Sequence, residues 1–263
     1  MYPTIGHFIF PITSYGVCLS LAFFAGIRMG ISVGAVLGFS IDEIIDIALW
    51  FLFSAIFGAR LLYIVLYPSE FTDIKSMFML TSGGLVFFGG FLATMTAVIV
   101  WAKIKKRRLR DLGDLIAPCL ALGHSIGRIG CFLNGCCYGT RTTICLGMVF
   151  PNLNDNIHRH PTQLYESFFL FIICLISLWN IKLRKKGIIP DGSVWGIYVL
   201  SYSIFRFFVE FIRDDDRGNF FLAKYLSFSQ AISILGFIFS IFWLYFCLRQ
   251  NNTESRKINE LEK

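Results

Sequence analysis

Seven long apolar segments constrain this 263-residue chain more than any other feature of its sequence. A helix of about 20 apolar residues is long enough to cross the ~30 Å hydrocarbon core of a bilayer, which argues against a soluble protein with buried helices. The composition agrees, because 56% of the residues are hydrophobic and only 16% are charged, whereas soluble domains carry about 25% charged residues. We therefore predict an all-α, polytopic membrane protein with about seven transmembrane helices and a small extracytoplasmic segment. The predicted spans are residues 14–36, 44–67, 83–102, 112–133, 164–181, 192–212 and 226–248.

Basic residues are distributed unevenly among the connections between these spans. One alternating set of connections holds fourteen Lys and Arg, and the other set holds six. Cytoplasmic loops are enriched in Lys and Arg, so the basic set is expected in the cytoplasm, with the N-terminus outside and the C-terminus inside. The net charge of +7 then has a topological explanation, and we expect no nucleic-acid partner. The basic set is 103–110, 182–187 and the tail from residue 249, and the other set is 68–82, 135–163 and 213–225.

The N-terminal segment is interpreted as a retained first span. No Lys or Arg precedes it, and no small-residue cleavage site follows it, as a signal peptide would require. We expect one integral membrane domain over residues 1–263. It includes an extracytoplasmic connection at 135–163 and a cytoplasmic tail at 249–263.

Four arginines lie inside the predicted spans: Arg28, Arg60, Arg128 and Arg206. Arg28 is near the inner end of its span, where it can extend its charge to the membrane surface. The other three lie nearer the outer halves, and each arginine in a span costs about 2.5–3.5 kcal/mol before it is paired. Two explanations remain open: internal ion pairs with carboxylates, or binding of an anionic ligand. The available carboxylates are Glu166, Glu210 and the run Asp214–Asp216.

The fourth span contains a histidine and an arginine on one helical face. His124 and Arg128 are at positions i and i+4, and an arginine fork near the outer surface suits two oxygens of a phosphate. His124 alone is more typical of a hydrogen-bonded packing residue. Gly123 and Gly127 form a small-xxx-small pair, which predicts close approach of another helix.

The sixth span ends in a second charged face. Arg206, Glu210 and Arg213 are at i, i+4 and i+7, so a continuous helix would align them. Glu210 can pair with both arginines, which leaves a net positive face suited to a phosphate. A purely structural ion-pair ladder is the alternative.

Further polar residues stand at the start of the fifth span, in the stretch "RHPTQLYES". Pro161 suits a first helical turn, and Tyr165 is also typical of an interfacial anchor. Glycine pairs at 83–84 and 89–90 precede and enter the third span, where helix packing is the favoured explanation. The polar residues of the fifth span are His160, Gln163, Tyr165 and Glu166.

The chain contains eight cysteines, and four of them follow the C-x4-C-C-x7-C pattern of Cys131, Cys136, Cys137 and Cys145. This spacing differs from the paired pattern of structural zinc sites. An external disulfide is possible in an oxidising compartment, but adjacent Cys136 and Cys137 are expected to point in different directions. Reduced packing thiols are the favoured interpretation, and we expect no metal.

Five ordered motifs give the chain a specific resemblance. They are "GARLLYIVLYP", "SGGLVFFGGF", "GRIGCFLNGCCYG", "HPTQLYES" and "FRFFVEFIRDDDRG". In this order they resemble the bacterial prolipoprotein diacylglyceryl transferase family over about residues 15–230. The resemblance implies a multi-pass enzyme of the bacterial cytoplasmic (inner) membrane, without a cofactor. Its implied partners are membrane lipid, namely phosphatidylglycerol, and the lipobox peptides of prolipoproteins, whose cysteine thiol receives the diacylglyceryl group while glycerol phosphate leaves.

The resemblance also implies roles for individual residues. The family's phospholipid-binding arginine falls on Arg128 and a later functional arginine on Arg206, and we expect both to stabilise the leaving phosphate. His124 is the first candidate for proton transfer from the thiol and His160 the second. The predicted catalytic set is Arg128, Arg206, His124, Glu210 and Tyr15, and the predicted substrate-binding set is Arg128, Asn134, Gly139, His160, Gln163, Tyr165, Glu166, Arg60 and Arg213.

The chain departs from the family's well-known form at three positions. Cys131 replaces an asparagine, Cys136 replaces a glutamate, and Phe88 stands where that form has a histidine, so the role of this histidine does not carry over. A transporter and a thiol-redox membrane protein are the alternatives from other classes. Absence of a visible repeat argues against the transporter, and tolerance of cysteine substitution would argue against the redox protein.

Overall fold

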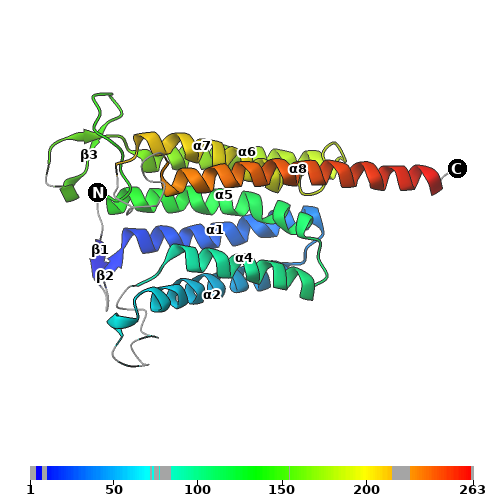
Figure 1. Cartoon of the computed structure of the whole chain (residues 1–263), viewed down its shortest axis with the longest axis horizontal. Coiled ribbons are helices and arrows are strands. Elements are labelled where there is room, and N and C mark those ends of the chain that lie inside the picture. The colour runs from blue at the N-terminus through cyan, green and yellow to red at the C-terminus, as the bar shows by residue number, and fades with distance from the viewer. Residues whose placement is uncertain are drawn as a thin grey trace. The chain divides into compact units, whose positions relative to one another are not determined.

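The computed structural model describes residues 4–7, 11–71, 73, 77, 84–153, 155–214 and 226–261. Within these residues seven helices are long and apolar enough to cross a membrane, which confirms the predicted fold class (Figure 1). Helix α7 continues directly into the 3-10 helix η4 (Glu210–Ile212), so the two form one span. The helices are α1 (Ser14–Leu37), α2 (Ile41–Leu66), α4 (Phe87–Ile104), α5 (Leu109–Asn134), α6 (Thr162–Lys185), α7 (Ser193–Val209) and α8 (Phe228–Leu261).

The predicted span boundaries agree with the helices except at the C-terminus. Helix α8 does not end at residue 248 but continues to Leu261, within the predicted cytoplasmic tail. No Pro or Gly occurs after Arg249, and these are the residues that most often end a helix. The predicted end of the span at residue 248 lies close to Asn251, where the membrane-spanning part of α8 ends, and the helix continues beyond this apolar stretch.

The chain divides into two compact units, Gly38–Leu112 and a larger unit of Met1–Leu37 with Gly113–Lys263. In the smaller unit, α2 and α4 pack through glycines. A Cβ atom on Gly89 would collide with the backbone carbonyl of Gly58, and one on Gly90 would lie 2.8 Å from the Ala55 carbonyl oxygen. This confirms helix packing for Gly89 and Gly90, whereas Gly83 lies outside the described residues.

In the larger unit, α7 packs between α6 and α8, and α5 contacts α1 through a glycine. A Cβ atom on Gly130 would lie 2.8 Å from Cys18 Cβ, so this position determines how closely the helices approach. The predicted pair was partly wrong: Gly123 contacts Ala22, but nothing lies within 4 Å of a Cβ on Gly127. Gly123, Gly127 and Gly130 all lie on α5, and of these three only Gly123 and Gly130 contact α1.

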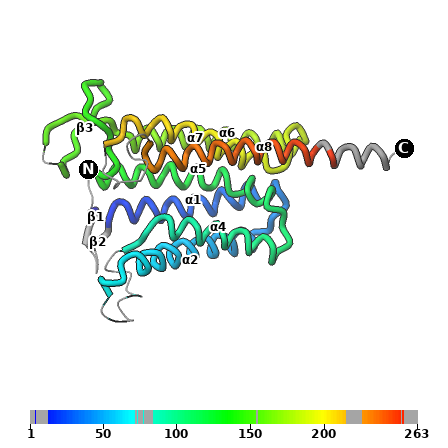
Figure 2. The backbone as a smooth tube through the Cα atoms, viewed as in Figure 1, coloured from blue at the N-terminus to red at the C-terminus, as the bar shows by residue number. Residues whose placement is uncertain are grey.

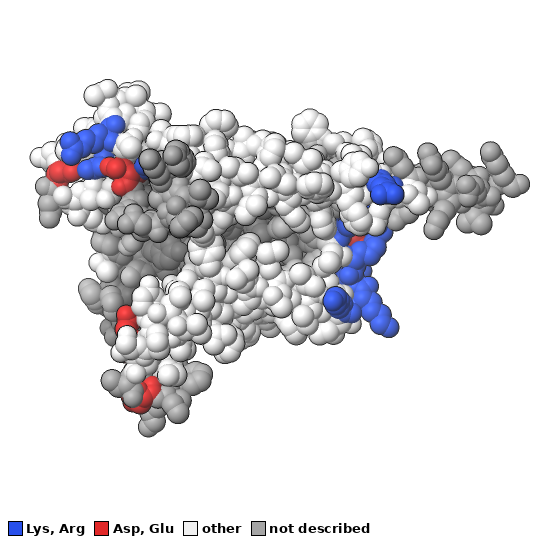
Figure 3. All heavy atoms as spheres, in the orientation of Figure 1, with Lys and Arg blue, Asp and Glu red and all other residues white. Residues whose placement is uncertain are grey.

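The outer side chains of the larger unit are largely apolar. In Figure 3 charged side chains are nearly absent along the length of α6–α8 on the side shown. Phe168, Phe208 and Phe242 are exposed residues of these three helices. Exposed aromatic and aliphatic side chains along helices of this length are typical of lipid contact. The protein is a multi-pass membrane protein.

A small β-structure connects α5 with α6 (Figure 2). Strands β3 (Met148–Val149) and β4 (His158–Arg159) pair antiparallel, and a separate pair is formed near the N-terminus by β1 (Thr4–His7) and β2 (Pro11–Thr13). Arg159 binds Asp155 and Asp214 at 3.0 and 2.8 Å, and its guanidinium lowers the pKa of the Asp155 carboxyl. Asp215 and Asp216, from the predicted acidic run, lie outside the described residues.

Candidate active site

Three arginines converge on one buried carboxylate in the larger unit. Glu166, in the first turns of α6, has no exposed surface. Arg128 Nη2 lies 3.0 Å from its Oε1, Arg206 Nε lies 3.9 Å from the same oxygen, and Arg213 Nη1 lies 3.6 Å from Oε2. The Tyr202 hydroxyl donates to Oε1 at 3.3 Å. We call Arg128, Arg206 and Arg213 the arginine cluster.

A second carboxylate stands beside the cluster. Glu210 Oε2 lies 2.7 Å from Arg206 Nη2, and its Oε1 accepts a hydrogen bond from the Ser227 hydroxyl at 2.8 Å. Arg206 Nη2 also donates to Ser229 Oγ at 3.0 Å. The predicted Arg206–Glu210 pair is therefore present.

The path of the chain to Arg213 differs from the prediction. The α-helix ends at Val209 and is followed by a 3-10 turn, after which Arg213 is extended (φ −90°, ψ 148°). The prediction that Arg206, Glu210 and Arg213 line one face of a continuous helix was therefore wrong, because Arg213 lies beyond the end of the helix. Arg213 reaches Glu166 because this turn redirects the chain.

The charges of this site do not balance among the residues that the structure describes. There, three guanidinium groups and two carboxylates give 3 − 2 = +1. Arg128 Nε and Arg206 Nη1 are buried and have no hydrogen-bond partner within the described part of the chain. Buried donors are nearly always satisfied in native proteins, so unpaired N–H groups together with a net positive charge are suited to an anion.

The start of α6 fixes the turn that follows α5. Thr162 and Gln163 are fully buried. Thr162 Oγ1 donates to the Cys137 carbonyl at 2.7 Å, and Gln163 Nε2 donates to the Cys136 carbonyl at 2.6 Å. Gln163 is thus a positioning residue for this turn, and its Oε1 has no partner among the described residues.

Gly139 lies where three segments meet. Its N–H donates to the His160 carbonyl at 2.8 Å, and it forms an isolated bridge with Arg213. A Cβ atom there would collide with the Ile212 carbonyl and lie 2.8 Å from Thr162. Because it has no side chain, Gly139 allows its backbone to approach those of His160 and Ile212 closely. Its bridge with Arg213 helps to position that member of the arginine cluster.

The remaining predicted residues of the larger unit lie around this centre. His160 Nδ1 is 3.3 Å from the Tyr165 hydroxyl. The Asn134 backbone carbonyl, at the end of α5, accepts from Asn152 at 2.9 Å. His124 packs edge-to-face against Tyr202, which also binds Glu166, with ring centroids 5.3 Å apart.

Tyr15 is the second residue of α1, and the residue is 41% exposed. It packs beside Gly130, where an added Cβ atom would lie 3.3 Å from Tyr15 Cδ2. Tyr15 therefore lies beside α5 at a point two residues beyond Arg128, and an exposed tyrosine there is accessible to a ligand.

Arg60 belongs to the smaller unit, and its contacts there are structural. Its Nε donates to the Met77 carbonyl at 2.8 Å and its Nη1 to the Gly84 carbonyl at 3.1 Å. The guanidinium also lies over the rings of Tyr63 and Phe71. Main-chain oxygens and aromatic faces thus offset the burial of this charge.

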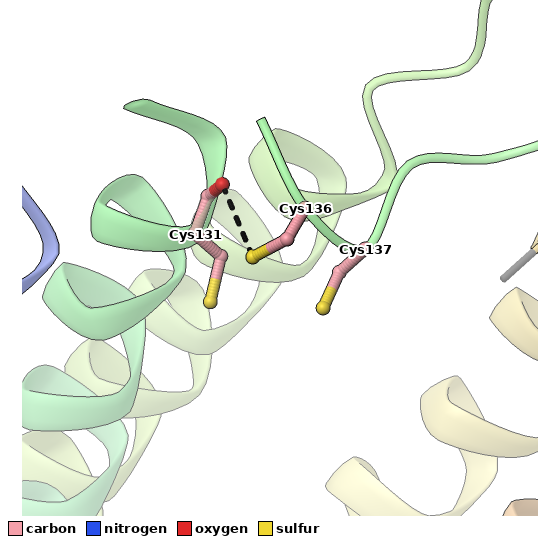
Figure 4. A group of neighbouring side chains, drawn as sticks. All are labelled: Cys131, Cys136 and Cys137. Carbon is pink, nitrogen blue, oxygen red and sulfur yellow. Dashed lines mark hydrogen bonds between the residues drawn. The ribbon is translucent and has the colours of Figure 1, made fainter. Parts of the chain in front are cut away.

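The cysteines differ most from the prediction. The thiol sulfurs of Cys131, Cys136 and Cys137 all lie within 4.8 Å of one another, and all three are free (Figure 4). The expectation that Cys136 and Cys137 point in different directions was wrong. Cys137 has a positive φ of 65°, which turns its side chain toward the other two. Hydrogen bonds from Cys131 and Cys136, followed by the charges of Arg213 and Arg128, lower the pKa of Cys137.

Comparison with known proteins identifies the family of the chain. The family model described as prolipoprotein diacylglyceryl transferase matches residues 3–246. The chain belongs to this transferase family. It is 34% identical to the phosphatidylglycerol–prolipoprotein diacylglyceryl transferase of Clostridium tetani over 88% of the chain and 91% of that relative. It is 33% identical to the protein of the same name from Cupriavidus metallidurans, over 82% of the chain and 79% of the relative.

A further relative is phosphatidylglycerol–prolipoprotein diacylglyceryl transferase 2 of Clostridium perfringens, which is 34% identical over 85% of the chain and 86% of the relative. The resemblance inferred from the five motifs is thus confirmed, and the chain is a transferase. Neither the transporter nor the thiol-redox alternative receives support from these similarities.

Sequence reasoning missed two residues that contact the arginine cluster and its carboxylates. Tyr202 is four residues before Arg206, so it shares the helical face of that arginine, and this spacing could have identified it. Ser229, which binds Arg206, carries no comparable signal, because it comes from α8 and meets α7 only through tertiary packing.

Proposed function

We propose that this protein transfers the diacylglyceryl group of phosphatidylglycerol to the thiol of the lipobox cysteine in prolipoproteins and releases glycerol phosphate. The observation that carries the proposal is the buried arginine cluster, in which Arg128 Nε and Arg206 Nη1 are buried without a partner and three positive charges face two carboxylates among the described residues. The phosphodiester of phosphatidylglycerol carries one negative charge, which matches this excess. Family membership supports the same reaction.

The chemistry explains why guanidinium groups are needed. The thiolate sulfur attacks the glycerol carbon that bears the phosphate ester, a C–S bond forms, and the C–O bond to phosphate breaks. Its electron pair leaves with the phosphate, so the diester monoanion becomes a monoester with one additional negative charge. The free N–H groups of Arg128 and Arg206 would stabilise this charge, which is greater in the transition state than in the bound lipid.

The other residues take supporting roles in this proposal. Glu166 and Glu210 hold the arginines in position, and Gln163 and Gly139 hold the turn that carries the cysteines. Tyr15, Asn134, His160 and Tyr165 contact the substrates at the rim, and Arg213 adds to the positive field. Arg60 is proposed to contact lipid from the smaller unit.

The thiol must also lose a proton, because a free thiol with a pKa of about 8.5 is only a few per cent thiolate at neutral pH. We assign the acceptor role to His124. It lies one turn from Arg128. Among the described residues its ring contacts Tyr202, and no hydrogen bond occupies either of its two nitrogens. His124→Gln should lower the transfer rate, and full activity of this variant would exclude the role.

We further propose that the protein resides in the bacterial cytoplasmic (inner) membrane with its N-terminus outside and its C-terminus in the cytoplasm. The excess of Lys and Arg in alternate connections supports this orientation. The arginine cluster then lies on the outer side, near the ends of α5 and α7. No nucleic-acid partner is proposed, because the Lys and Arg residues that give the net positive charge are concentrated in the connections expected in the cytoplasm.

The test is reconstitution of the purified protein with phosphatidylglycerol and a lipobox peptide. Mass spectrometry should detect the diacylglyceryl thioether of the peptide and an equal amount of glycerol phosphate. Arg128→Gln should lower kcat by about 100- to 1,000-fold, the usual effect of removing one charge-stabilising donor. Arg28→Gln is the matched control, because Arg28 is also within a span but is exposed and binds Ser32 of its own helix at 2.6 Å.

Two results would contradict the proposal. One is no thioether product from the intact protein under conditions in which a family relative works. The other is equal activity of the Arg128 and Arg28 variants, since the arginine cluster would then have no part in the reaction.

A further inference from the structure

The three clustered thiols have the geometry of a metal site with one open position. Zinc bound by cysteines has Zn–S distances of about 2.3 Å, so sulfurs in a tetrahedral site lie about 3.8 Å apart. The sulfurs of Cys131, Cys136 and Cys137 are already within 4.8 Å of one another. Each would have to move by only about 0.6 Å to reach bonding distance, which side-chain rotation can supply.

The backbone holds these cysteines in this arrangement at a conformational cost. Cys137 adopts a left-handed conformation (φ 65°) that is unusual for a residue with a side chain. The carbonyls of Cys136 and Cys137 are fixed by the buried side chains of Gln163 and Thr162. Two buried side chains thus stabilise an unusual turn that directs its thiols toward Cys131. Such a backbone conformation is typical of functional sites, where it holds ligands in place before binding.

The surroundings match the charge of such a centre. A divalent ion with three thiolates carries a charge of −1, and Arg213 forms an isolated bridge with Gly139, two residues after Cys137. Cys131 is three residues after Arg128 and so lies on the same face of α5. All three thiols are partly exposed, so an ion can reach them.

We propose that Cys131, Cys136 and Cys137 bind a zinc ion whose fourth position binds the thiol of the lipobox cysteine. This inference rests on the transfer function proposed above and names the group that activates its nucleophile. It differs from our expectation that the C-x4-C-C spacing would not bind a metal, because that expectation ignored the turn that brings the thiols together.

The transfer would proceed from a zinc-bound thiolate. The peptide thiol binds the ion as thiolate, and its proton passes to the acceptor proposed above. The sulfur electron pair then attacks the glycerol carbon of phosphatidylglycerol, a C–S bond forms, and glycerol phosphate leaves with the C–O electron pair. The resulting thioether is neutral and a weaker ligand than a thiolate, so the product dissociates while the three cysteines retain the ion.

The experiment uses the full-length protein, purified in detergent under reducing conditions and loaded with Co²⁺ as a spectroscopic substitute for zinc. We expect one ion per chain, with cobalt–thiolate charge-transfer absorption and the d–d bands of a tetrahedral site. Cys137→Ser should weaken binding at least 100-fold. Cys145→Ser is the matched control, because Cys145 is exposed and outside the cluster, and should bind like the wild type.

A second measurement tests the open position. Adding a lipobox peptide should change the d–d bands, whereas a peptide with serine in place of cysteine should not. Absence of cobalt–thiolate absorption, equal binding by the Cys137 and Cys145 variants, or bands that do not respond to the cysteine peptide would each overturn the proposal. Co²⁺ binding by a protein that forms no thioether product would instead contradict the transfer function alone.

Activity separates the two proposals further. Removal of zinc by a chelator should lower transfer at least tenfold, and added Zn²⁺ should restore it. Full transfer by the chelated protein, with its metal content measured as zero, would refute the zinc centre while leaving the transferase function intact. Thermal unfolding of the serine variants distinguishes a lost ligand from a lost fold.

Discussion

Glu166→Gln is the substitution that most directly tests the arginine cluster. At an effective dielectric constant of about 20, a charge pair 3.0 Å apart, the Arg128–Glu166 distance, attracts with about 5.5 kcal/mol. The contacts at 3.6 and 3.9 Å to Arg213 and Arg206 add about 4–5 kcal/mol each. Desolvation of the buried carboxylate offsets most of this attraction, and removing one partner of a buried ion pair costs about 3–5 kcal/mol in practice.

The assay is thermal unfolding of the purified protein in detergent, combined with binding to phosphatidylglycerol in nanodiscs. We expect a Tm about 10 °C lower than that of the wild type, from the usual few degrees per kcal/mol. Binding should change in the opposite direction. The site charge rises from +1 to +2, so the affinity for the anionic lipid should increase several-fold at low salt.

Asp155→Asn serves as the control, because the Asp155 carboxylate is partly exposed and Arg159 keeps Asp214 as a second partner, so no buried charge is left unpaired and little stability should be lost. An unchanged Tm for Glu166→Gln would refute the view that its carboxylate neutralises the cluster. Weaker lipid binding together with lower stability would show that Glu166 supports the lipid site instead of competing for its charge.

Two further substitutions test the scaffold around the site. Gly139→Ala should lower the free energy of unfolding by about 1–3 kcal/mol, because its methyl group would collide with the Ile212 carbonyl; urea titration measures this, and an unchanged midpoint would contradict the packing role. Asp114 accepts hydrogen bonds from Arg184, Gly192 and the Trp195 amide at 2.7–3.0 Å and is fully buried. Asp114→Asn should therefore cost about 3 kcal/mol in stability but leave the transfer rate per folded molecule near that of the wild type, and a rate loss without a stability loss would contradict this.

The spans could be predicted because membrane insertion selects for apolar length, which is a local property of the sequence. The continuation of α8 to Leu261 could not, because beyond residue 248 the helix is polar and the hydropathy signal disappears. Its boundary depended instead on the absence of helix-ending residues.

The site was predictable in part. Arginine inside a span is costly, and this cost pointed to Arg60, Arg128 and Arg206 together. The family resemblance then singled out Arg128 and Arg206. The choice of Glu166 as their common partner depends on how α5, α6 and α7 pack, which spacing along one helix does not specify. Arg213 shows the limit clearly: helical periodicity placed it on the correct side, but a 3-10 turn, not a helix, brings it there.

The depth of the cluster in the membrane follows from its distance to the helix ends. Arg128 is six residues before the end of α5, Glu166 four residues into α6, and Arg206 six residues before the end of η4. At 1.5 Å per residue these positions lie about 6–9 Å from the span ends. This depth is the boundary between lipid head groups and acyl chains. A phospholipid can thus present its phosphate, and the glycerol carbon next to it, to the cluster without leaving the bilayer. An ion-pair network built only for stability would gain nothing from this depth, because every ångström toward the surface lowers the cost of burying its charges.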